Sequence, residues 1–94
     1  MEKFMVVCTF KQGTQMSDVY EVVAEEQAKA AELQAAGKIG AIHLATISRG
    51  TVFIETNAAN IEEATATIQS LPMAIWWDID VFPLSDPGKP GANS

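Results

Sequence analysis

The chain has 94 residues, 48% of them hydrophobic and 19% charged, and its formal net charge is −6. This length suits one small domain, and an acidic chain without a basic stripe is a poor candidate for binding nucleic acid or an anionic membrane. No apolar run approaches the roughly 18 residues of a membrane-spanning helix, and the N-terminus lacks the pattern of a signal peptide. We therefore expect a cytoplasmic protein that does not bind membranes.

The first half of the chain predicts a strand followed by one long helix. Residues 3–11 (KFMVVCTFK) are apolar on both faces of the predicted strand. Ser17 is the expected N-cap of a helix that runs to about residue 36, and Gly37 is expected to end it in a left-handed conformation. Cys8 is the only cysteine, so an intrachain disulfide is impossible, and a buried, inert thiol is expected.

The second half begins with a predicted hairpin. Residues 39–47 and 51–56 read as paired strands. Residues 48–50 (SRG) are expected to form a three-residue loop, with its glycine in the left-handed position. Asn57 or Asn60 is then expected to cap a second, shorter helix.

The remaining segments complete a recognisable order of elements. Residues 71–72 (LP) end the second helix, and residues 75–82 (IWWDIDVF) read as the last strand. We expect a domain over residues 1–84 and a flexible tail over residues 85–94, which contain two Pro and two Gly. The order β-α-β-β-α-β predicts an α+β, ferredoxin-like fold: a four-stranded antiparallel sheet with two helices on one face.

The predicted sheet has an apolar face that the predicted helices do not cover. All four strands are apolar on both sides, although the helices cover only one side. We therefore expect the bare face to pack against a second copy of the chain. The result would be a homodimeric α+β barrel, with a higher oligomer of dimers as a further possibility.

One carboxylate interrupts the apolar face of the first predicted helix. At about 100° per residue, Glu26 falls within the arc of roughly 100° that is formed by Val19, Val22, Val23, Ala30 and Leu33. Burying a carboxylate costs several kcal/mol unless it is paired, hydrogen-bonded or protonated. The functional interpretation is a group with a raised pKa that moves protons. The alternative is a side chain that reaches the helix flank or meets a polar partner at a subunit interface.

Two stretches of the sequence resemble the muconolactone delta-isomerase family. Residues 71–84 (LPMAIWWDIDVFPL) are similar to the family's C-terminal segment, which has Leu-Pro, a short apolar stretch, aromatic or Met residues, Asp-Ile-Glu-Val and a closing Leu. Asp80 stands in the place of the Glu. Residues 24–26 (AEE), followed by Leu-Gln at 33–34 and Gly37, resemble the family's first helix in residue type and spacing.

This resemblance implies a dimeric barrel that assembles further, often into a ring of dimers. It also implies an enzyme that shifts a double bond in a lactone ring of aromatic catabolism without a metal or other cofactor. The substrate is then a small molecule, and Glu26 or its neighbour Glu25 is the general acid/base. We favour Glu26, because Glu25 lies roughly 100° further round the helix, at the edge of the apolar stripe.

Two departures from the family pattern concern the substrate. The family's second strand is rich in Trp and carries an Arg that would hold a substrate carboxylate, whereas residues 39–44 (IGAIHL) contain neither. The family's hairpin is also longer and contains aromatic and His residues. These differences argue against muconolactone itself as the substrate.

His43, the only histidine, is a candidate second proton carrier. With a three-residue hairpin loop it faces Glu55 directly across the ladder, and with a two-residue loop it faces Thr56. A His43–Glu55 pair could relay protons beside the substrate, with the carboxylate setting the imidazole tautomer. The alternative is a structural cross-strand pair.

Tyr20, Val23, Trp76 and Trp77 are the remaining candidates for contact with a substrate. Tyr20, one turn into the helix, could donate a hydrogen bond to a substrate oxygen. Val23 and the two tryptophans could wall a pocket for a flat ring, although packing in the core or at an interface is equally compatible with the tryptophans.

The sequence therefore predicts a cofactor-free, isomerase-like enzyme that acts on a small cyclic, lactone-like or aromatic-derived compound. The alternatives are a cofactor-free oxygenase or cyclase on the same scaffold, and a non-catalytic module that binds a small ligand or serves oligomerisation. An enzyme requires a cavity of about 300 Å³ or more lined by Glu26. An assembly module would instead show Glu26 paired or in solvent.

Overall fold

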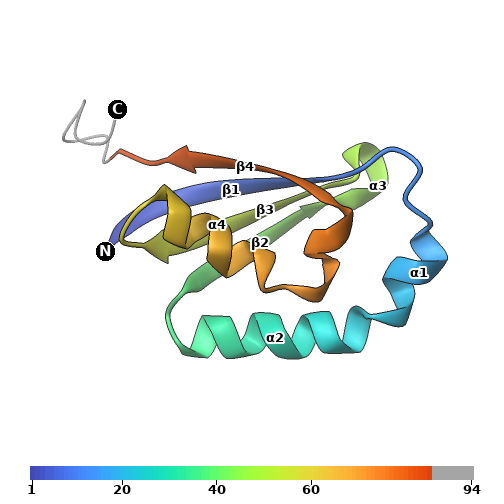
Figure 1. The fold of residues 1–94 in the computed structure, drawn as a ribbon, viewed down its shortest axis with the longest axis horizontal. Coiled ribbons are helices and arrows are strands. Elements are labelled where there is room, and N and C mark those ends of the chain that lie inside the picture. Colours follow the sequence, from blue (N-terminus) through green and yellow to red (C-terminus); the bar gives the residue numbers. More distant parts are fainter. Residues whose placement is uncertain (86–94) are drawn as a thin grey trace.

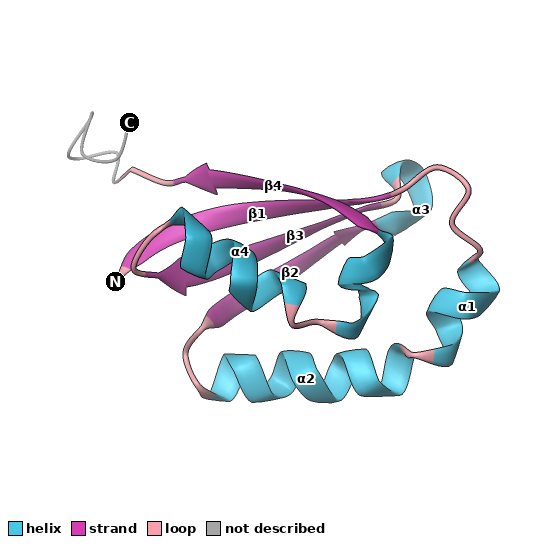
Figure 2. Cartoon of the chain, viewed as in Figure 1, coloured by secondary structure: helices cyan, strands magenta, loops and turns pink. Residues whose placement is uncertain are grey.

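The computed structural model describes residues 1–85, in which four antiparallel strands form one sheet in the order β2-β3-β1-β4 and the two longer helices lie on one side of it (Figure 1). The strands are β1 (Glu2–Phe10), β2 (Ile39–Ala45), β3 (Thr51–Ala58) and β4 (Trp77–Pro83). The helices are α1 (Met16–Glu21), α2 (Val23–Ala35), the single turn α3 (Thr46–Arg49), α4 (Ile61–Gln69) and the 3-10 helix η1 (Pro72–Trp76) (Figure 2). The predicted α+β, ferredoxin-like fold is confirmed. Residues 86–94, most of the predicted tail, lie outside the described residues.

β1 is a central strand, and its alternation decides what each face of the sheet buries. Phe4, Val6 and Cys8 point towards the helices and are fully buried. Met5 and Val7 point to the opposite face, which no helix covers, and are only half-buried. Each fully buried apolar side chain of this size contributes roughly 1.5–3 kcal/mol to folding, so the helix side of the sheet holds the core.

The helices reach this core with residues three or four positions apart, the spacing of one helix face. α2 buries Ala30 and Leu33, and α4 buries Ala64 and Ile68. Asn60, rather than the alternative Asn57, caps α4, because its side-chain oxygen accepts a hydrogen bond from a backbone N–H in the first turn at 2.8 Å. None of the helices in residues 1–85 is both long and apolar enough to cross a membrane.

The single helix predicted from Ser17 to residue 36 is wrong, because the helical segment breaks at Val22, as the short loop in Figure 2 shows. Val22 has φ −107° and ψ 10°, outside the helical range. The Val22-Val23 pair is β-branched and therefore fits poorly in a helix interior. The N-cap position is Gln15, two residues before the predicted Ser17, and no side chain caps the first helix.

The end of α2 is as predicted. Gly37 has φ +74°, which a residue with a side chain rarely adopts. The Gly37 N–H donates to the Gln34 carbonyl at 3.0 Å, and the Lys38 N–H donates to the Leu33 carbonyl at 2.9 Å. These two bonds form a Schellman motif, which satisfies carbonyls that the helix leaves unpaired.

The hairpin between β2 and β3 differs from its prediction. Ala45 is opposite Thr51, so the loop includes the helical turn α3 and is longer than the predicted residues 48–50. The Gly50 N–H donates to the Thr46 carbonyl at 3.1 Å and completes that turn. The left-handed glycine was predicted correctly, since Gly50 has φ +57°. A bulge within residues 39–42 shifts the start of β2.

The last strand begins later than predicted. Pro72 occupies the first position of η1, where its missing N–H costs nothing. Trp76 belongs to this 3-10 helix and does not alternate along the strand, so β4 starts at Trp77 rather than at residue 75.

The side of the sheet that faces away from the helices is partly apolar. Phe82 is opposite Met5, and Val7 lies between Phe53 and Asp80 on the neighbouring strands. Phe82 is 52% exposed in the single chain, whereas Phe53 is half-buried. This bare face therefore presents large apolar side chains that residues 1–85 of one chain leave uncovered.

Candidate functional site

A cavity of about 610 Å³ lies between α1, α2 and the helix side of the sheet. The helices contribute Val19, Tyr20, Val23, Glu26, Gln27 and Ala30 to its lining, and the strands contribute Phe10, Ile42, Leu44, Val52, Ile54 and Trp77. The residues at its mouth are strongly exposed: Tyr20 by 68%, Leu44 by 70% and Ile47 by 103%. The cavity is therefore mostly apolar and opens to solvent at one end.

Glu26 is half-buried in the wall of this cavity. Its Oε1 accepts a hydrogen bond from the backbone N–H of Met73 at 2.8 Å. Burial raises the pKa of the Glu26 carboxyl, and the Met73 hydrogen bond lowers it by a smaller amount. The neutral form of Glu26 is therefore favoured more than it would be in water.

The donor to Glu26 is a consequence of how η1 begins. The first N–H groups of a helix have no partner inside it. Pro72, at the first position, has no N–H, so Met73 carries the first N–H of the turn. η1 packs beside the first turn of α2, where Glu26 lies. The start of one element thus positions the carboxylate of another.

Cys8 lies close enough to Glu26 for their charges to interact. Burial, and secondly the negative charge of Glu26, raise the pKa of the Cys8 thiol from 9.0 to about 12. The side chain is fully buried and free, so the prediction of a buried thiol is confirmed. A neutral thiol of this kind is a poor nucleophile.

Three of the predicted substrate-contacting residues line the cavity: Tyr20, Val23 and Trp77. Trp77 packs edge-on against Phe10, with ring centroids 6.1 Å apart and an angle of 74° between the rings. Its indole Nε1–H is buried and has no acceptor among the described residues. The walls are therefore aromatic on the side formed by β1 and β4.

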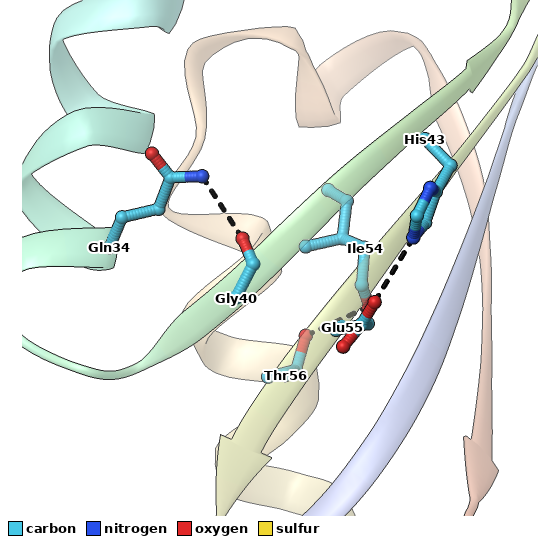
Figure 3. Close-up of polar contacts among 6 residues, drawn as sticks. All are labelled: Gln34, Gly40, His43, Ile54, Glu55 and Thr56. Atoms are coloured by element: carbon cyan, nitrogen blue, oxygen red, sulfur yellow. Dashed lines mark hydrogen bonds and ion pairs between the residues drawn. The ribbon is translucent and has the colours of Figure 1, made fainter.

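The structure does not bring His43 or Glu55 to this cavity. His43 Nε2 and Glu55 Oε2 are 3.0 Å apart (Figure 3), so the two side chains do form a pair. The predicted direct pairing is wrong, however, because His43 is opposite Phe53 and reaches Glu55 diagonally. Both side chains lie on the bare face, largely exposed, whereas Glu26 lies on the helix side.

Glu25 and Trp76 also lie away from the cavity lining. Glu25 is exposed on α2, as its angular offset from Glu26 suggested. Trp76 is half-buried in η1. Within residues 1–85, no three His, Cys, Asp or Glu side chains gather in a way that could hold a metal ion.

Comparison with known proteins identifies the family. The family described as Muconolactone delta-isomerase matches residues 3–88 of the sequence. The chain belongs to the muconolactone delta-isomerase family. A search of curated proteins found no significant match. A crystal structure of muconolactone isomerase is similar to this chain with a TM-score of 0.72 and 21% sequence identity, and the match covers 97% of both chains. At that identity the likeness shows a shared fold.

The match to the muconolactone delta-isomerase family spans every element that builds the cavity, yet several lining residues were not predicted. Thr46 and Ile47 line the mouth from α3, although both were predicted as the end of a strand. Gln27 lines the cavity beside Glu26, and its position next to the apolar stripe is the sequence signal for it. Met73 contributes to the site through its backbone N–H, which donates to Glu26. The type of side chain at position 73 does not predict that contact.

Proposed function

We propose that the chain is a cofactor-free isomerase that moves a proton, and with it a double bond, within a small, oxygenated, unsaturated ring compound. The observation that carries this proposal is the half-buried Glu26 carboxylate in a mostly apolar cavity of about 610 Å³. That volume exceeds roughly 300 Å³, the lower end of the range for pockets that bind small molecules. Membership of the muconolactone delta-isomerase family supports the same class of reaction.

Glu26 acts twice in the proposed reaction. Its carboxylate removes a proton from a ring carbon that the conjugated carbonyl makes acidic, and the negative charge of the resulting dienolate rests on the carbonyl oxygen. The neutral carboxyl then returns the proton to the carbon two positions away, so the double bond moves and no electrons are gained or lost. A carboxyl whose pKa is raised towards the working pH serves both steps, because it is neither too weak a base nor too strong an acid.

The other lining residues hold the ring. Val23 and Trp77 form apolar walls, and Tyr20 and Thr46, which also line the cavity, each carry a hydroxyl group that can donate to a ring oxygen. The hydrogen bond from Met73 holds the Glu26 carboxylate in one orientation, which reduces the cost of aligning it with the reacting carbons.

We further propose that two chains associate through their bare faces. Half-buried Met5, Val7 and Phe53 and the exposed Phe82 lie on this face, and a two-fold axis would pack each patch against its own copy. The proposed cavity chemistry lies on the other side of the sheet, so each chain keeps its own Glu26.

A non-catalytic module that binds a small ligand is the second candidate function. One observation favours it: Glu26 is the only carboxylate or imidazole among the described residues that line the cavity. A single group must then carry every proton transfer. A measurement of turnover distinguishes the isomerase from the non-catalytic binding module.

The test uses Glu26→Gln with Glu25→Gln as the matched control. Both variants remove one negative charge from neighbouring positions of α2, but only Glu26 lines the cavity. Isomerisation of a panel of unsaturated lactones is followed by NMR in heavy water, which also reports deuterium incorporation. We expect Glu26→Gln to lower kcat by about 100- to 10,000-fold and Glu25→Gln to change it by less than about twofold. Full turnover by Glu26→Gln would rule out the assignment.

A further inference from the structure

The charges around the cavity limit which ligand it can bind. Among the described residues that line it, Glu26 is the only Asp or Glu, and none is Lys, Arg or His. The described cationic side chains all lie outside the lining: Lys3, Lys11, Lys29, Lys38 and Arg49. The part of the lining that the structure describes therefore offers a ligand one acidic group and no basic group.

An anionic ligand would meet two penalties in such a site. Its carboxylate would leave water for mostly apolar walls without a cation to pair with. It would also be repelled by the carboxylate form of Glu26, and at the reduced effective dielectric constant of a protein this repulsion is far stronger than in water. An uncharged ligand meets neither penalty.

We propose that the ligand of this cavity is an uncharged, largely apolar ring compound with a carbonyl oxygen, whose ring substituent is an alkyl, aryl or ester group rather than a carboxylate. The ring and its carbonyl group follow from the proposed function, on which this part of the inference rests. The uncharged substituent follows from the charges of the residues that line the cavity. Muconolactone, whose ring carries a carboxymethyl group, is then a poor ligand.

The remaining lining residues fit an uncharged ligand. Ile42 and Val52, on the sheet side of the cavity, would pack against an apolar substituent. Burying each additional methylene group strengthens binding by about three- to fourfold. The lining residues that can donate to a carbonyl oxygen are uncharged, and Tyr20 and Thr46 each carry a hydroxyl group.

The decisive comparison is between γ-butyrolactone that carries a carboxymethyl group and the methyl ester of the same acid. Both rings are saturated, so neither can isomerise, and the two compounds differ mainly in charge. Binding is measured by the fluorescence of Trp77 in a Trp76→Phe background, because Trp76 lies outside the lining and the chain has two tryptophans. At pH 7 we expect the ester to bind at least about tenfold more tightly than the acid.

Two variants test the electrostatic cause. Glu26→Gln should strengthen binding of the acid relative to the ester, whereas Glu25→Gln should not, because Glu25 is exposed outside the cavity. Gln27→Arg places a cation in the lining from an exposed position on α2 and should strengthen binding of the acid while leaving the ester within about twofold. Equal or tighter binding of the acid by the unmodified cavity would overturn the inference.

The outcomes also separate this inference from the proposed isomerase. Selective binding of the ester, with no isomerisation of the corresponding unsaturated esters or of α-angelica lactone, would refute the isomerase and leave the ligand class standing. The protein could isomerise both the unsaturated acid and the unsaturated ester and bind their saturated forms with equal affinity. That result would refute the ligand class alone. No binding of either lactone would refute the ligand class, and turnover of the unsaturated lactones would still decide the isomerase.

Discussion

The backbone N–H of Met73 donates to Glu26 Oε1 at 2.8 Å and joins the first turn of η1 to the first turn of α2 across 47 residues of the chain. Burial and this bond act in opposite directions on the Glu26 pKa, and burial is the larger effect. The carboxylate is thus held in a fixed orientation at a place where its charged form is poorly solvated. Both properties suit a group that must accept a proton and return it.

Glu26→Gln should change how the stability of the protein depends on pH. The folded-state pKa of Glu26 lies above the ordinary value of 4.5, so the folded state binds more protons than the unfolded state between the two values. The free energy of unfolding therefore falls as the pH rises through this window. The favourable contribution of the neutral carboxyl is complete below pH 4.5 and is lost above the raised pKa.

The Gln variant keeps an oxygen that can accept the Met73 N–H, but it has no proton to lose. Its free energy of unfolding should therefore rise relative to that of the unsubstituted protein as the pH increases through the window. Urea titrations of both proteins across this range, with Glu25→Gln as control, measure the difference. Parallel curves for the Glu26→Gln variant and the unsubstituted protein would show that the folded state leaves the Glu26 pKa unshifted.

The Cys8 thiol should react very slowly in the folded protein. With a pKa of about 12, the thiolate fraction at pH 8 is on the order of one part in ten thousand, and the side chain is fully buried. A disulfide reagent should label the folded chain at least about 100-fold more slowly than the chain in urea. Cys8 is the only cysteine, so the signal has one source.

Glu26→Gln provides an internal check on this thiol. The negative charge of Glu26 is the second cause of the raised Cys8 pKa, so removing it should lower that pKa and speed labelling of the folded state at high pH. Labelling that is unaffected by Glu26→Gln would show that the two groups do not interact. Equal rates in buffer and in urea would contradict the burial itself.

The fold was predictable because the hydrophobic pattern, the turn residues and the order of the elements all indicate the same arrangement. Phe4, Val6 and Cys8 share one face of β1, which the helices bury, and Gly37 provides the left-handed residue that ends α2. The order of elements then leaves one sheet arrangement for the helices to cover. Glu26 was identifiable for the same reason, since a carboxylate within an apolar helix face is a local inconsistency.

The features that sequence analysis missed depend on contacts between distant segments. Ile47 looked like a strand residue, but it is fully exposed in a helical turn, and this longer connection moved His43 opposite Phe53. The partner of Glu26 is a backbone N–H, which every residue except proline carries. Its position follows from how η1 packs on α2, and no local pattern encodes that packing.

His43→Gln should leave isomerisation unchanged within about twofold. His43 and Glu55 lie on the opposite side of the sheet from the Glu26 cavity, so neither can reach a ligand held there. The measurement is kcat/KM on the best lactone substrate, with Glu26→Gln as the variant that does lose activity. A large loss in the His43 variant, with an unchanged circular dichroism spectrum and sedimentation coefficient, would show that the proton path includes this pair.

Phe82→Asp should weaken the proposed dimer by about 100-fold or more. Phe82 is already 52% exposed in the single chain, so the substitution costs the folded monomer little. In a two-fold symmetric contact between bare faces, each dimer would bury two new carboxylates, and an uncompensated buried charge costs several kcal/mol. Nearby Asp80, on the same face of β4, adds repulsion.

Sedimentation over a range of concentrations measures this effect directly. The unsubstituted chain should sediment as a species of at least twice 10.1 kDa, and Phe82→Asp should shift it towards the monomer. Ala31→Asp adds the same charge at an exposed position on α2, away from the bare face, and should leave the assembly intact. If the unsubstituted chain sediments as a stable monomer, the bare face is not an interface between copies, because no second chain then covers Met5, Val7, Phe53 and Phe82.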